Sequence, residues 1–499
     1  MVGLNGELVE VEADLAPRQQ PTFLIVGLPD AAIQEAKERI RFAIENSGFN
    51  FPRYKVTVNL APADLKKEGA VYDLAMAVSI LCTTKQLSGK FDDSIFLGEL
   101  ALDGKTRSTT GILPATIFAK ENNYKNIFVP TQNAAEAALI SGINVYPVFC
   151  LAELYGHLSG FKLIAPIDRT QAVIRNPKEP ALFATDMSDI CGQEQAKRAL
   201  EIAAAGSHNV LLVGPPGSGK TLLAKTFPTV LPALSEPEII EVTKIYSIAG
   251  LLPKDNPVIL NRPFRSPHHT GSGVALVGGG KIPKPGEISL AHRGVLFLDE
   301  FPEFPRAVIE NLRQPLEDGT ISISRAQGTL TFPARFTLIA SQNPCPCGYS
   351  TDPDKSCLCT PIQIIKYQKK ISGPIIDRFD LHVSVPRLNY EKLQPNQTPE
   401  TSTVIRNRVE AAIRKQNDRF ANSKSQYNSE MNPAEIKKFC ELDNSSTEIL
   451  KNAISQLFMS ARSVHRVLKV ARTIADLAGE STIKLEHLAE ALQYRPKQN

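Results

Sequence analysis

Long apolar runs are missing from this chain, although 42% of its 499 residues are hydrophobic. A helix that spans a bilayer needs about 20 apolar residues in succession, so we expect no transmembrane segment and no membrane partner. The first residues also lack a basic stretch followed by an apolar one, the pattern of a secretory signal. We therefore expect a cytoplasmic location, where the eight cysteines stay reduced.

An excess of charge of one sign is missing too. The formal net charge is +4, with 56 Lys and Arg residues against 52 Asp and Glu residues. This balance does not demand a nucleic-acid partner, so any DNA-binding surface must be local. Internal repeats and low-complexity tracts are also absent, and the length predicts two to four ordinary globular domains.

The chain does contain a complete phosphate-binding loop, Gly214-Pro215-Pro216-Gly217-Ser218-Gly219-Lys220-Thr221, between an apolar strand at residues 209–213 and a helix. Glycines let the loop turn its N–H groups toward phosphate oxygens, and the helix N-terminus adds partial positive charge. In this pattern Lys220 reaches the β- and γ-phosphates of ATP, and the Thr221 hydroxyl ligates Mg²⁺. The alternative is a glycine-rich turn without a nucleotide.

A second motif supplies the other half of such a site. The apolar run at residues 295–298 ends in Asp299 and Glu300, as a buried parallel strand with a functional carboxyl end does. Asp299 is placed to hold Mg²⁺, and Glu300 to polarise the water that attacks the γ-phosphate. Together the two motifs favour a nucleotide hydrolase over a core strand that ends in a polar turn.

Three regions differ in their patterns. Residues 1–165 alternate strands (22–26, 54–60, 95–100 and 126–130) with helices (31–47 and 73–81), and residues 166–187 are typical of a linker. Residues 188–386 alternate strand and helix as a doubly wound domain does, with an insertion between Lys220 and Asp299. After a second linker at 387–402, residues 403–499 predict amphipathic helices at 403–416, 433–439, 447–457, 463–477 and 484–492.

Several segments together resemble the AAA+ superfamily, and within it the magnesium-chelatase-like branch that includes the ComM/YifB proteins. They are Asp189 to Leu200, Pro263-Phe264-Arg265-Ser266-Pro267-His268-His269, Pro285 to His292, Ala340 to Gly348, and Gly373 to Asp380. The resemblance covers essentially the whole chain. It implies a multidomain α/β fold with a Lon-protease-like N-terminal domain, an AAA+ P-loop domain and a C-terminal helical lid.

The resemblance also implies roles for single residues. Asn343 matches the sensor that orients the attacking water, and Arg378 matches the arginine finger that reaches a neighbouring subunit's γ-phosphate. An arginine supplied by a neighbour stabilises the transition state only once a ring has assembled. Arg462 is our choice for the second sensor, with Arg466 as a competitor one turn away. For each arginine the alternative is a surface ion pair.

Two further segments qualify the resemblance. Residues 318–332 alternate apolar and polar side chains about a turn and predict a β-hairpin, whose equivalent in related rings lines the pore. Arg325 near its tip is placed to grip a DNA phosphate, or is an ordinary surface arginine. The N-terminal region lacks the serine–lysine pair of a Lon-type protease, because residues 67–73 hold no serine and Leu113 stands where the lysine falls. Proteolysis is therefore disfavoured.

The eight cysteines include one cluster, Cys345-Pro346-Cys347 and Cys357-Leu358-Cys359. Four thiolates are the ligands of a structural Zn²⁺, although each pair is spaced more tightly than is usual. A disulfide and unliganded cysteines remain as alternatives.

His268 and His269 are adjacent and, on a strand, face opposite ways, so we expect them to contact a substrate or a neighbouring subunit rather than one metal.

Two functions follow from the resemblance. The first is a ring-forming ATPase, hexameric, that moves on single-stranded or branched DNA as a branch-migration helicase in recombination or natural transformation. The second is a chelatase-type ATPase that remodels a partner protein. Arg325 in the hairpin favours DNA.

Overall fold

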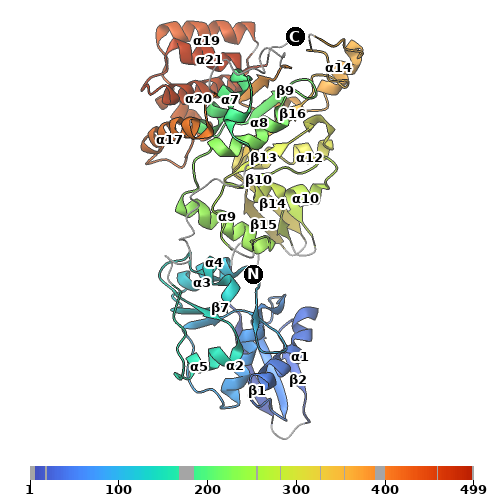
Figure 1. The fold of residues 1–499 in the computed structure, drawn as a ribbon, viewed down its shortest axis with the longest axis vertical. Helices are drawn as coiled ribbons and strands as arrows, with labels where there is room; N and C mark the ends of the chain where they lie inside the picture. The colour runs from blue at the N-terminus through green and yellow to red at the C-terminus, as the bar shows by residue number, and fades with distance from the viewer. Residues whose placement is uncertain are drawn as a thin grey trace. The chain divides into compact units, whose positions relative to one another are not determined.

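The structure, a computed structural model, describes residues 6–16, 20–167, 185–253, 257–280, 283–325, 328–352, 354–387, 399–457 and 459–496 (Figure 1). The chain divides into two compact units. Unit 1 is formed by residues 1–177 and 236–259, and unit 2 by residues 178–235 and 260–499. The expected ATPase and lid regions thus share one unit, while residues 236–259 belong with the N-terminal region.

Unit 1 begins with a three-stranded sheet. The central strand β3 (Lys55–Ala61) pairs antiparallel with β1 (Glu10–Ala16) and parallel with β2 (Phe23–Val26). Helix α1 (Ala31–Asn46) buries Ile33, Ala36, Ile40 and Ile44, which recur at helical spacing, in the core that also receives α2 (Asp73–Thr83). The expected strands at 22–26 and 54–60 and both expected helices are confirmed, whereas β1 was not predicted.

A second sheet of unit 1 consists of three parallel strands, β4 (Ser94–Phe96), β7 (Asn126–Pro130) and β8 (Asn144–Val148). The strand expected at 95–100 is divided, because Gly98 adopts a φ of +157° between β4 and β5 (Glu99–Leu100). Strand β5 pairs with β6 (Thr106–Arg107). The helices of this part are α3 (Ile112–Glu121), α4 (Ala134–Ala137), α5 (Leu151–Leu158) and α9 (Glu236–Ala249).

Unit 2 is built on a five-stranded parallel sheet. Its order is β10 (Phe264–Arg265), β13 (Val295–Leu298), β16 (Thr337–Gln342), β9 (Val210–Val213) and β17 (Leu381–Ser384). All four pairings are parallel, so the carboxyl ends of the five strands lie at one edge. Helices α7 (Glu194–Gly206) and α8 (Lys220–Thr226) flank β9 in sequence.

The C-terminal part of unit 2 is helical, as expected. Helices α17 (Ser402–Arg419) and α20 (Ala461–Leu477) pack on each other and on α7, and their apolar faces join the core of the parallel sheet (Figure 1). They are accompanied by α18 (Pro433–Phe439), α19 (Asn444–Gln456) and α21 (Leu485–Gln493). The residues described therefore form a mixed α/β multidomain protein with a parallel sheet and a helical C-terminal region.

Smaller elements connect these parts. The expected hairpin is present as β14 (Thr320–Arg325) and β15 (Gly328–Pro333), but the side chain of Arg325 lies outside the described residues. The others are α10 (Gly273–Val277), β11 (Gly278–Gly279), β12 (Lys284–Pro285), α11 (Glu287–Leu290), α12 (Arg306–Glu310), α13 (Arg313–Asp318), α14 (Pro361–Gln368) and α15 (Gly373–Ile376). Within the described ranges no helix combines the length and apolarity that a bilayer span needs.

Candidate functional site

The phosphate-binding loop connects the carboxyl end of β9 to α8. Gly217 and Gly219 adopt φ values of +76° and +91°, which L side chains rarely adopt, so glycine is required at both turns. A Cβ atom at Gly214 would lie 2.1 Å from the Val385 carbonyl oxygen, so the loop passes closely over the end of β17. The loop is thus shaped by three of its glycines.

Lys220 lies inside this loop and is 8% exposed. Its ammonium group donates to the carbonyl oxygens of Gly214 at 2.8 Å and Pro215 at 2.7 Å, and lies 3.4 Å from Asn343 Oδ1. Burial lowers its pKa, although Asp299 counteracts this. The expected sensor residue and the loop lysine are therefore in contact.

The two nucleotide motifs meet at Asp299. The Thr221 hydroxyl donates to Asp299 Oδ2 at 2.8 Å, and the Ser341 hydroxyl from the neighbouring strand β16 donates to Asp299 Oδ1. A hydroxyl and a carboxylate oxygen at this distance are hard ligands of the kind that Mg²⁺ prefers. The donor set at the end of the sheet therefore fits a magnesium ion held by Thr221 and Asp299.

Glu300 follows directly and is 58% exposed at its side chain. Its φ is +51°, a left-handed conformation that costs a non-glycine residue about 1 kcal/mol or more. Its backbone N–H donates to Asp299 Oδ1 at 3.0 Å and lies 3.4 Å from Ser341 Oγ, which holds this conformation. Ser341 was not predicted, although it lies at the carboxyl end of β16, two residues before Asn343.

The expected arginine finger is nearly buried. Arg378 has a 6% exposed side chain and forms an ion pair with Glu317. Burial lowers its pKa; Glu317 counteracts this, while Arg462 and Arg313 add to it. Arg462, 58% exposed, also lies 3.7 Å from Glu317 Oε1. The two proposed arginines thus share one carboxylate.

Arg466, the competitor of Arg462, has a different environment. It is paired with Asp380 at 2.6 Å and donates to the Arg378 carbonyl oxygen at 2.9 Å. Asp380 is buried and also accepts from the Asn209 backbone N–H at 3.1 Å. Arg466 therefore ties helix α20 to the start of β17, whereas Arg462 stays exposed.

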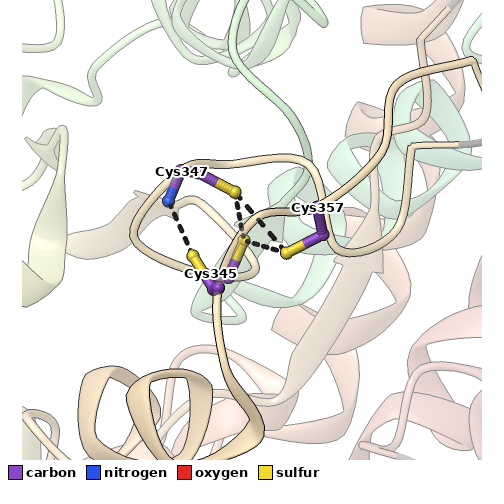
Figure 2. Close-up of side chains that lie close together, drawn as sticks. Cys345, Cys347 and Cys357 are labelled. Atoms are coloured by element: carbon purple, nitrogen blue, oxygen red, sulfur yellow. Dashed lines mark hydrogen bonds between the residues drawn. The ribbon is translucent and has the colours of Figure 1, made fainter.

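The four clustered cysteines converge in the loop after β16, and Figure 2 shows three of them, Cys345, Cys347 and Cys357. Their sulfur atoms all lie within 4.8 Å of one another, and no disulfide joins any cysteine of the described chain. The separations are 3.4 Å between Cys345 and Cys347, 3.7 Å between Cys345 and Cys357, and 3.5 Å between Cys347 and Cys357. The backbone N–H of Cys347 donates to Cys359 Sγ at 3.4 Å. The converging residues are the four that the sequence predicts as metal ligands, Cys345, Cys347, Cys357 and Cys359.

This cysteine loop also contacts the phosphate-binding loop. A Cβ atom at Gly348 would lie 2.5 Å from Cδ of Pro216, and Gly348 has a φ of +86°. Only glycine fits there, because both the space and the backbone conformation exclude a side chain. The sequence spacing did not predict this contact.

Three family descriptions match successive parts of this chain. Residues 186–393 match the family described as "Magnesium chelatase, subunit ChlI", residues 11–133 match "Subunit ChlI of Mg-chelatase", and residues 399–495 match "Magnesium chelatase, subunit ChlI C-terminal".

Individual relatives agree. The competence protein ComM of Haemophilus influenzae is 43% identical over 99% of this chain and 96% of its own length. The protein YifB of Escherichia coli is 41% identical over 99% of this chain and 95% of its own length. The magnesium-chelatase 38 kDa subunit of Cereibacter sphaeroides is 28% identical over 32% of this chain and 52% of its own length.

Proposed function

Because this chain belongs to the magnesium-chelatase-like AAA+ family that includes ComM and YifB, we propose that it hydrolyses ATP at the loop between β9 and α8. The observation that carries the proposal is the 2.8 Å hydrogen bond from Thr221 to Asp299, which joins the phosphate-binding loop to the acidic strand end. We also propose a cytoplasmic location, a compartment in which unpaired cysteines are usual.

Each residue then has a separate task. The Lys220 ammonium exchanges its loop carbonyls for the β- and γ-phosphates, and the loop glycines and Ser218 provide backbone N–H donors. Thr221 and Asp299 hold Mg²⁺, which neutralises developing phosphate charge. Glu300 accepts a proton from the attacking water, and Asn343 orients that water. Asn343 Oδ1 lies 3.4 Å from Lys220 Nζ, which supports the proposal that both act on the same phosphate group.

A homo-oligomeric ring, hexameric in our proposal, completes the site. Arg378 of one protomer reaches the neighbour's γ-phosphate, after the neighbour's nucleotide has displaced Glu317 as its partner. Both guanidinium groups contact Oε1 of Glu317, so Arg462, which we propose as the second sensor, lies beside the proposed finger. Arg466 is better suited to a structural role than to a sensor role, since it is paired with buried Asp380.

The substrate that we propose is DNA, single-stranded or branched, on which the ring acts as a branch-migration helicase during recombination or natural transformation. Support comes from the relative named as a competence protein, which matches this chain along nearly its whole length. The hairpin β14–β15 is the segment that we propose to line the pore. The alternative, remodelling of a partner protein, is supported by the more distant chelatase subunit.

ATP turnover with and without single-stranded, duplex and four-way-branched DNA, at low and high salt, tests this function. DNA contacts release counterions, so stimulation should weaken as salt rises. Lys220→Ala should weaken ATP binding, while Glu300→Gln should bind ATP but hydrolyse it only at a small residual rate. Normal turnover by Glu300→Gln would remove Glu300 from its role, and stimulation by no DNA would favour the protein-remodelling alternative.

The four clustered cysteines form, in our proposal, a structural Zn²⁺ site. Tetrahedral zinc with Zn–S bonds of about 2.3 Å separates its sulfur atoms by about 3.8 Å. The three measured separations of 3.4–3.7 Å are close to this value, and the residues contribute sulfur ligands only. The donor set and its spacing therefore fit zinc, and metal analysis of the purified protein should find one Zn²⁺ per chain.

A further inference from the structure

Outside the nucleotide motifs, a histidine side chain lies beside the residue that we propose as the base. His269 Nδ1 lies 3.3 Å from Glu300 Oε2, and the His269 side chain is 28% exposed. The imidazole ring is bordered by the ring of His268, with centroids 4.2 Å apart, and by that of Phe304, with centroids 6.3 Å apart. The histidine is therefore packed on two sides while its Nδ1 faces a carboxylate that is itself 58% exposed.

The fold brings these two residues together. Strand β10 pairs parallel with β13, so the loop that follows β10 and the residues that follow β13 emerge at the same edge. The start of the loop is fixed by Arg265, which donates to both carboxylate oxygens of Glu287 at 2.6 Å. Bidentate pairs of this kind add geometric precision as well as energy.

We propose that His269 is a positioning residue for Glu300. A mostly exposed glutamate samples several rotamers, and an acceptor of a water proton is effective only in the right place. An interaction of His269 Nδ1 with Oε2, which lie 3.3 Å apart, selects one rotamer and leaves Oε1 to accept the proton of the attacking water. The histidine itself takes up no proton in this step, so the proton passes from water to the carboxylate as before.

This inference rests on the proposed ATP hydrolysis. It assigns the positioning of Glu300 to a residue that lies outside both the phosphate-binding loop and the acidic strand end. It predicts that removal of His269 slows the chemical step without weakening nucleotide binding. Substitution of His269 by Asn or Gln tests where the interacting nitrogen must lie. The Asn amide nitrogen occupies a position like Nδ1, whereas the Gln amide lies one bond farther out.

The experiment compares the full-length wild-type chain with His269→Ala, His269→Asn and His269→Gln, and measures both ATP affinity and kcat. We expect the Ala and Gln variants to lose about tenfold or more in kcat, the Asn variant to recover most of it, and ATP affinity to change little in any of them. The same exchange at His157 in unit 1, whose Nδ1 accepts from the Ile164 N–H at 3.0 Å, is the matched control.

A double variant makes the test specific. If His269 acts through Glu300, adding His269→Ala to Glu300→Gln should produce no further loss, because residues that act as a unit are not additive. A wild-type rate or a faster rate in His269→Ala would overturn the inference, and so would a further loss in the double variant or a parallel loss of ATP affinity. A wild-type chain that does not hydrolyse ATP would instead refute the proposed function.

Discussion

Glu136→Gln is expected to favour the folded form of unit 1 at pH 8, and to do so much less at pH 5. Glu136 is fully buried in α4. Its carboxylate accepts from Asn133 Nδ2 at 2.6 Å and from the Ser247 hydroxyl of α9 at 2.8 Å, so it joins α9 to the N-terminal residues. Burial raises its pKa from 4.5 to about 7, more than these hydrogen bonds lower it.

The magnitude follows from linkage. The pKa of Glu136 is higher in the folded state than in the unfolded state. The stability that protonated Glu136 gives to the fold is therefore complete below the unfolded pKa of 4.5 and is lost as the pH rises through about 7. One pH unit is worth about 1.36 kcal/mol, so between pH 5 and pH 8 the loss amounts to about 2–3 kcal/mol. Gln has the shape of the protonated acid and stays neutral, so the variant should avoid this loss.

Hydrogen exchange of the α9 amides in the full-length chain, corrected for intrinsic rates, measures the effect where Ser247 lies. The ratio of protection between variant and wild type should rise by up to about a hundredfold from pH 5 to pH 8. Glu35→Gln on the exposed face of α1 is the control, and should follow the wild type. If Glu136→Gln keeps the pH profile of the wild type, the buried carboxyl does not govern how α9 is held.

The remaining predictions concern unit 2. Arg378→Ala should lower ATP turnover only in the assembled oligomer, with Arg335→Ala, a 44% exposed surface arginine, as its control; unchanged turnover in the oligomer would refute the finger. Burial raises the pKa of Asp380, but the charge of Arg466 outweighs burial and holds the pKa well below its usual range. The stability that ionised Asp380 gives to the fold is therefore present above the unfolded pKa and is lost as the pH falls through the folded pKa. Asp380→Asn should therefore cost about 3 kcal/mol in urea unfolding at pH 7, and no change would show that the pair stabilises nothing. Cys357→Ser should lose zinc in metal analysis and weaken ATP affinity severalfold, because the cysteine loop touches the phosphate loop; full metal content would exclude the site.

Local patterns in the sequence predicted the elements that have strong periodicity. Helix α1 appears because Ile33, Ala36 and Ile40 recur at helical spacing, and the five C-terminal helices appear for the same reason. Strand β1 was not predicted, although its sequence EVEADLA alternates acidic residues with Val11, Ala13 and Leu15, the pattern of a half-buried strand. Its place is set by seven pairings with β3, from Glu10 opposite Ala61 to Ala16 opposite Lys55, which are tertiary information.

The position of α9 is a second feature of the fold that the sequence did not predict. The length between Lys220 and Asp299 predicted an insertion, but nothing in the sequence of α9 says where it packs. The structure places it in unit 1, where Ser247 reaches Glu136 across more than a hundred residues of chain. A lone serine and a lone glutamate carry no motif, so only the fold reveals their pairing.

The nucleotide site shows how far one rule extends. The phosphate loop follows β9, Asp299 and Glu300 follow β13, and Asn343 follows β16, so each proposed residue lies past the carboxyl end of a parallel strand. Had β10 been recognised, the same rule would have placed the segment after it at this edge, and His269 with it. A strand of two residues leaves no periodicity to read. The contact between His269 and Glu300 is therefore a consequence of sheet order rather than of any motif.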